Sequence, residues 1–167
     1  METLVDTVIE EPRWETAGLE AMSEQAAQAV LAELGLSATG FTLCVMGCDD
    51  DRIATLNADF RGKPKPTNVL SWPSDDRAPP APGLMPDLPD PGDSDDPEEL
   101  GDIAIAWGVC QTEAAEQGKP FAAHVTHLVA HGVLHLLGFD HETEEDAALM
   151  EGIEIRALAR LGIPNPY

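Results

Sequence analysis

Basic and aromatic residues are scarce in this sequence. Among its 167 residues, 9 lysines and arginines stand against 31 aspartates and glutamates, which gives a formal net charge of −22. That charge excludes proteins that coat nucleic acid or anionic membranes by bulk electrostatic attraction, but it leaves room for a local site that binds a phosphate. Aromatic residues make up only 5%, whereas hydrophobic residues reach 43%. The chain is therefore expected to form one folded domain, residues 1–167, with a mainly aliphatic core.

The sequence also lacks long apolar runs and any cysteine spacing typical of a zinc or redox site. No stretch approaches the roughly 18 apolar residues of a membrane-spanning helix, and the N-terminus lacks the basic start and apolar run of a signal peptide. The three cysteines, Cys44, Cys48 and Cys110, match no zinc or redox spacing. If Cys44 and Cys48 share one strand, they lie about 13 Å apart, too far for a disulfide. We therefore expect reduced, structural thiols in a cytoplasmic protein.

The hydrophobic periodicity indicates strands and helices that do not alternate regularly. This is typical of an α+β fold, here with a small mixed sheet of about four strands packed against helices. Strands are expected at residues 3–9, 41–46, 67–72 and 102–107. Helices are expected at residues 15–34, 120–137 and 144–161, with a short helix after the Asp49–Asp51 caps and another ending at Gln117.

Residues 74–99 differ from the rest of the chain in composition. They contain seven prolines, nine acidic residues and one arginine. Such a segment has too few apolar side chains to order itself by burial. It is therefore expected to be a mobile loop inserted between two strands, without a catalytic part, and removable without loss of the fold.

All five histidines lie between positions 124 and 141. His131 and His135 are four residues apart, so on a helix both rings project from one face. Gly138 then ends the helix, and the turn after it can bring His141 back toward them. Three neutral imidazoles meeting at one point are the ligand set of a catalytic zinc with an open fourth position. A metal held there lowers the pKa of bound water from 15.7 to about 7. The alternative is that the histidines only pack or cap.

The same histidine spacing occurs in the metzincin proteases, H-E-x-x-H-x-x-G-x-x-H. Here the glutamate that serves such a protease as general base is replaced by Gly132. A glycine cannot take a proton from water. The pattern therefore keeps the metal site without the peptidase base, which favours other chemistry.

Residues 131–141, H-G-V-L-H-L-L-G-F-D-H, resemble the metal motif of the YbeY endoribonucleases, also called rRNA maturation factors. They match every fixed position of H-G-x-L-H-L-x-G-[YF]-D-H. Residues 56–63 (L-N-A-D-F-R-G-K) and 66–73 (P-T-N-V-L-S-W-P) are similar to the family's arginine loop and the strand after it, and residues 100–103 (L-G-D-I) to another strand start. The chain departs from the family pattern at three positions and in one segment. Pro64 and Asn68 stand where the family often has aspartate, and Trp72 stands where it often has phenylalanine. The insert at residues 74–99 is longer than is usual in the family.

The resemblance covers nearly the whole chain and implies a zinc-dependent endoribonuclease of the cytoplasm, with one Zn²⁺ per chain. Single-stranded RNA and precursor ribosomal RNA, particularly the 3′ end of 16S rRNA, are the implied substrates. The small ribosomal subunit and its associated factors are the implied partners, in ribosome maturation and quality control. Neither a membrane nor DNA is expected as a partner.

The expected catalytic residues are Arg61 and His131, and the expected metal ligands are His131, His135 and His141. Arg61 is the candidate guanidinium for the phosphoryl oxygens, on which negative charge gathers during cleavage; alternatively it is a solvated loop charge. Four further residues are expected to orient a ligand or contact RNA: His127, Asp140, Lys63 and Lys65. His127 can equally be packed, and Asp140 can equally be a turn residue. His124 and Asp102 are weaker candidates.

Two other functions stay open from the sequence alone. One is a metalloprotease that uses a base other than the usual glutamate. The other is a ribosome assembly or RNA-binding factor whose zinc is structural. The net charge of −22 indicates weak RNA affinity or a partner that supplies it.

Overall fold

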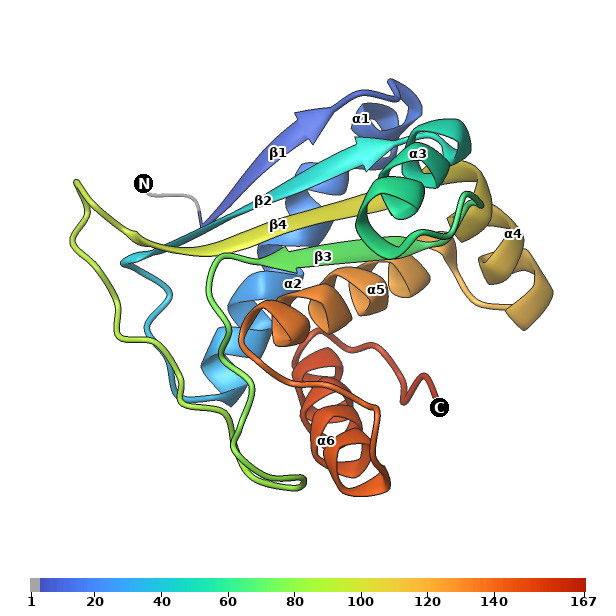
Figure 1. The fold of residues 1–167 in the computed structure, drawn as a ribbon. Coiled ribbons are helices and arrows are strands. Elements are labelled where there is room, and N and C mark those ends of the chain that lie inside the picture. The colour runs from blue at the N-terminus through green and yellow to red at the C-terminus, as the bar shows by residue number, and fades with distance from the viewer. Residues whose placement is uncertain (1–3) are drawn as a thin grey trace.

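The protein folds around a four-stranded mixed sheet (Figure 1). The structure, a computed structural model, describes residues 4–167, so Thr3 of the expected first strand lies outside the described residues. In sheet order the strands are β1 (Val5–Ile9), β2 (Phe41–Cys48), β4 (Glu98–Ala106) and β3 (Val69–Pro73). The β1–β2 and β2–β4 pairs are parallel, and β3 is antiparallel to β4. The predicted α+β fold with a small mixed sheet is confirmed.

Helices cover both faces of this sheet (Figure 1). They are α1 (Arg13–Ala17), α2 (Leu19–Glu33), α3 (Asp50–Arg61), α4 (Trp107–Gln117), α5 (Phe121–Leu136) and α6 (Glu144–Arg160). The main core lies between one face and α2 and α5, with α6 packed against both helices. The smaller cluster on the other face includes Ile53 of α3. None of the helices within residues 4–167 has the length and apolar character needed to span a bilayer.

Strand β4 shows why the sheet carries helices on both sides. Successive side chains of a strand point to opposite faces. Ile103 and Ile105 join the main core under α5, whereas Ala104 and Ala106 join the cluster under α3. The strand begins at Glu98 and not at Asp102 as expected. Glutamates and a glycine make residues 98–101 poor strand formers, but the chain pairs there with β2 and β3, and pairing decides the conformation.

The helix expected at residues 15–34 is two helices. Gly18 adopts a φ of 85° between them, and its N–H bonds to the carbonyls of Trp14 and Glu15 at the end of α1. Trp14 is fully buried, and its indole N–H donates to the carbonyl of Cys48 at 3.0 Å. Tertiary packing of that tryptophan therefore overrides the continuous helical pattern.

The three cysteines are free thiols, and Cys44 and Cys48 lie on the same strand, as predicted. Burial raises the pKa of Cys48 to about 12 and also raises that of Cys110. Both groups therefore stay protonated at neutral pH and pack as small apolar side chains.

The connection between β3 and β4 contacts the rest of the protein, contrary to the expectation of a loop without ordered contacts. The guanidinium of Arg77 is almost fully buried and donates to the carbonyls of Leu136 at 3.0 Å and Leu100 at 3.3 Å. Farther along, the N–H of Gly92 bonds to the carbonyl of Gly40, and Pro86 is buried. Composition missed this because an arginine can order a segment by satisfying carbonyls at a helix end, with no apolar burial.

Arg77→Ala is therefore expected to destabilise the fold. The substitution removes the side-chain donor from the carbonyl of Leu136 in α5, whereas the carbonyl of Leu100 in β4 keeps the N–H of Ser74. The loss at Leu136 costs about 1–3 kcal/mol in the free energy of unfolding. Urea denaturation measures this loss. The matched control is Arg52→Ala, which removes an exposed arginine with one ion pair to the exposed Glu10. Equal small effects in both variants would mean that Arg77 does not hold the segment.

Candidate metal centre and adjoining cleft

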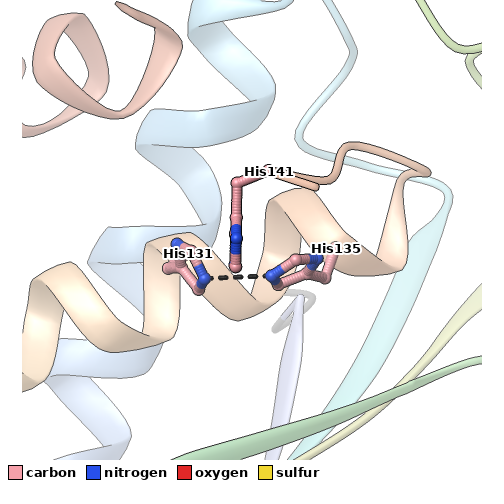
Figure 2. A group of neighbouring side chains, drawn as sticks. All are labelled: His131, His135 and His141. Atoms are coloured by element: carbon pink, nitrogen blue, oxygen red, sulfur yellow. Dashed lines mark hydrogen bonds between the residues drawn. The ribbon is translucent and has the colours of Figure 1, made fainter. Parts of the chain in front are cut away.

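Helix α5 brings His131 and His135 together on one face, next to the turn that carries His141 (Figure 2). The Nε2 atoms of His131 and His135 are 2.9 Å apart. The ring of His141 lies 5.2 Å, centre to centre, from each of the other two rings. One ring nitrogen from each of the three lies within 4.8 Å of the others. The predicted convergence of these three histidines on one point is therefore present in the structure.

The turn after α5 fixes where His141 lies. Gly138 adopts a φ of 102°, a conformation that side chains disfavour. A Cβ there would also lie 2.3 Å from the carbonyl oxygen of Arg77. Phe139 is buried next to it, and the side chain of Asp140 accepts the backbone N–H of His141 at 2.8 Å. Asp140 thus shapes the turn, which was one of its two predicted roles.

Both helical histidines are oriented through their Nδ1 atoms. Nδ1 of His131 bonds to a carboxylate oxygen of Glu154, and Nδ1 of His135 bonds to the carbonyl of Phe139 at 2.9 Å. Each acceptor requires the proton on Nδ1, so the two facing Nε2 atoms carry lone pairs. In neutral rings these lone pairs, 2.9 Å apart, repel each other unless a proton or a metal ion lies between them. Ligand nitrogens on tetrahedral zinc lie about 3.4 Å apart, so the group fits such an ion.

Burial keeps His135 neutral. Burial first, and then the neighbouring His131 and His141, lower the pKa of His135 to about 4. A metal ligand must be a neutral imidazole. His135 therefore binds a cation without proton competition down to about pH 5.

The metal-free protein is expected to lose stability as pH falls from 7 to 5. An unfolded histidine takes up a proton near pH 6.5, whereas folded His135 takes it up only near pH 4. Between these values the unfolded state binds more protons, so unfolding becomes easier by roughly 1–2 kcal/mol. Chemical denaturation of chelator-treated protein at both pH values measures the change. His135→Asn should show a smaller pH dependence; an unchanged dependence would assign it to other groups.

Glu154 of α6 is a site residue that the sequence analysis missed. Its carboxylate is fully buried and bonds to His131, to Nε2 of His127 at 3.1 Å and to the hydroxyl of Tyr167. Burial alone raises the pKa of Glu154, but the hydrogen bonds with His127, His131 and Tyr167 lower it to about 2. One signal was available: Glu154 lies within the buried stripe of α6, with Met150, Ile153, Ala157 and Leu158.

A cleft of about 1190 Å³ adjoins the three histidines. Arg61, at the end of α3, lines it together with Phe60, His127 and the turn residue Asp140. The β3–β4 connection forms another part of its wall, from Asp75 to Pro86. The structure thus brings Arg61 and the histidines to one cleft, although they are 70 or more positions apart along the chain.

Other predicted residues lie outside this cleft. Lys63 and Lys65 are exposed beyond its lining, so their contact with RNA stays a prediction. His124 is buried and bonds to Glu113 at 3.0 Å, which makes it a packed residue. Asp102 lies on β4 opposite Trp72 and does not reach the cleft.

Gly132 lies where α5 approaches the sheet most closely. A Cβ at position 132 would lie 3.0 Å from Cδ1 of Ile103 on β4. A larger side chain would therefore require the side chain of Ile103 to shift. The absence of a protease-like glutamate is thus also a packing requirement.

Comparison with known proteins agrees with this geometry. The family model described as Endoribonuclease YbeY matches residues 6–162. Endoribonuclease YbeY of Cereibacter sphaeroides is 63% identical over 167 residues, covering 100% of both chains, and that of Dinoroseobacter shibae is 56% identical over 98% of this chain and 90% of its own. The solution structure of TM1509 from Thermotoga maritima shares the fold, with a TM-score of 0.55, 22% identity and coverage of 95% of this chain and 91% of that one. The chain belongs to the Endoribonuclease YbeY family.

Proposed function

We propose that this protein is a zinc-dependent endoribonuclease that cleaves single-stranded RNA, with the 3′ end of precursor 16S rRNA as a substrate. The observation that carries the proposal is the single cleft that joins Arg61 to three imidazoles whose ring nitrogens lie within 4.8 Å of one another. Family membership supports the same reaction class. One Zn²⁺ per chain is held by His131, His135 and His141.

The residues of the cleft have separate roles in phosphodiester cleavage. A zinc ion bound to the three histidines supplies a water activated near neutral pH and stabilises negative charge on the phosphoryl oxygens. Arg61 binds two phosphoryl oxygens at once with its planar guanidinium. His131, a metal ligand, and His127 both line the cleft, where His127 contacts the RNA.

The charge of the chain supports a partner that presents the RNA. With a net charge of −22 and acidic residues such as Asp75, Asp76 and Asp146 along the cleft, bulk attraction of RNA is absent. The small ribosomal subunit and its associated factors, in the cytoplasm, supply that affinity. Lys63 and Lys65, the exposed cations next to Arg61, contact the RNA backbone outside the cleft.

The test is cleavage by the pure protein of three substrates: a single-stranded RNA that carries the precursor 16S 3′ end, the same RNA in a duplex, and casein. We expect cleavage of the single strand, loss of activity with chelator and recovery with zinc. Digestion of casein would support a metalloprotease, and RNA binding without cleavage would support an assembly factor with a structural zinc. Cleavage that persists with chelator would refute the metal dependence.

A further inference from the structure

Glu154 is buried in a place where a carboxylate is costly. None of its surface is exposed, and its neighbours in the buried stripe of α6 are mostly apolar. Within residues 4–167 no lysine or arginine forms an ion pair with it. Its hydrogen bonds come from two histidines and a tyrosine. An apolar residue of similar size would stabilise this core better, so the carboxylate points to a function.

The function follows from which atom donates in the hydrogen bond between His131 and Glu154. An ionised carboxylate only accepts, so Nδ1 of His131 carries the proton and Nε2 carries the lone pair. The same bond sets the rotation of the ring, which turns Nε2 toward Nε2 of His135. A backbone carbonyl does the same for His135. On α5 the carboxylate also binds His127, one turn before His131, so it spans two turns of the helix.

We propose that Glu154 is the positioning residue of the metal centre, which holds His131 in the tautomer and rotation that bind zinc. This inference rests on the proposed metal site. Tyr167 completes the arrangement, since its hydroxyl donates to the carboxylate oxygen that also faces His127. Glu154 is not itself one of the three proposed ligands, and it acts on the metal through its bond to His131.

Zinc affinity of the Glu154→Gln variant, measured by competition with a chromophoric chelator, tests the inference. Glutamine has the same shape but can donate its amide N–H to Nδ1, which places the ring proton on Nε2. We expect the dissociation constant for zinc to rise about 10–100-fold. Glutamine cannot accept from all three groups that bond to Glu154, so the metal-free variant should melt below the parent, and zinc affinity is measured well below that temperature.

A second glutamate–histidine pair, between Glu113 of α4 and His124 of α5, provides the matched control. His124 bonds to Glu113 at 3.0 Å and lies outside the cleft, so Glu113→Gln should leave the zinc affinity within about threefold of the parent. Tyr167→Phe should also have a small effect, because it leaves the bond to His131 in place. Unchanged zinc affinity in Glu154→Gln, or an equal loss in Glu113→Gln, would overturn the inference.

A measurement on the parent protein makes the test independent of how the variants fold. Nitrogen-15 NMR of the metal-free chain should show His131 with its proton on Nδ1. A proton on Nε2 of neutral His131 would overturn the inference, even if zinc binds. If the parent binds no zinc at all, the metal site itself is wrong, which is a different result from loss in the variant alone.

Discussion

His135→Ala should lose its bound zinc, from about one equivalent per chain to less than about a tenth. The variant removes one of three nitrogens that converge within 4.8 Å, and no fourth histidine, cysteine or carboxylate joins the group among the residues that the structure describes. Two imidazoles hold zinc far more weakly than three. RNA cleavage should fall with the metal, by at least about 10²-fold. Metal analysis after gel filtration, together with a cleavage assay, measures both effects.

The control for this variant is His124→Gln. His124 lies on the same helix but bonds to Glu113 away from the cleft, so the variant should retain its zinc. A full equivalent of zinc in His135→Ala would refute the ligand assignment. Loss of zinc in both variants would point to a general loss of the fold.

Arg61→Ala should lower the rate of RNA cleavage by about 10²–10³-fold, which is the scale for removing one preorganised donor to a transition state. Arg61 is exposed at the end of α3, and within residues 4–167 it forms no ion pair that would give it a structural role. Its guanidinium carbon lies over the ring of Phe60, 6.0 Å from the ring centre, and both residues line the cleft. Zinc content and melting temperature should therefore stay at the parental values.

Arg61→Lys separates charge from geometry. Lysine keeps the positive charge but meets phosphate as a point, whereas arginine binds two oxygens with a planar fork. We expect the lysine variant to lose much of the rate, though less than alanine. Lys63→Ala, which removes a neighbouring cation outside the cleft, should change the rate only a few-fold. Cleavage by Arg61→Ala at the parental rate would remove Arg61 from the mechanism, and loss of zinc would make it a structural residue.

The convergence of His131, His135 and His141 could be predicted from the sequence because its geometry is local. His131 and His135 are one helical turn apart, and Gly138 turns the chain within three residues, so spacing alone brings His141 near. Glu154 and Arg77 could not be found in this way. Glu154 meets His131 across 23 positions, and Arg77 meets Leu136 across 59. Periodicity identifies a buried face, but it does not say which distant helix covers that face.

The strand and helix boundaries show the same limit. The helices α5 and α6 begin and end within one residue of the expected positions, because their glycines and caps are encoded nearby. The break at Gly18 and the start of β4 at Glu98 depend instead on Trp14 and on pairing with β2, which the local sequence does not contain.

Two of the three proposed metal ligands, His131 and His135, lie on a helix that is packed in the core. Helix α5 lies between the sheet and α6, and Gly132 holds it against β4. Because α5 is packed against the sheet and against α6, we expect its amides to exchange with solvent only through a large opening of the core. His141 lies on an exposed turn after the helix, where local opening costs far less. The centre therefore has a fixed pair of ligands and one ligand that can leave and return on its own, so an ion can enter or exit while the protein stays folded.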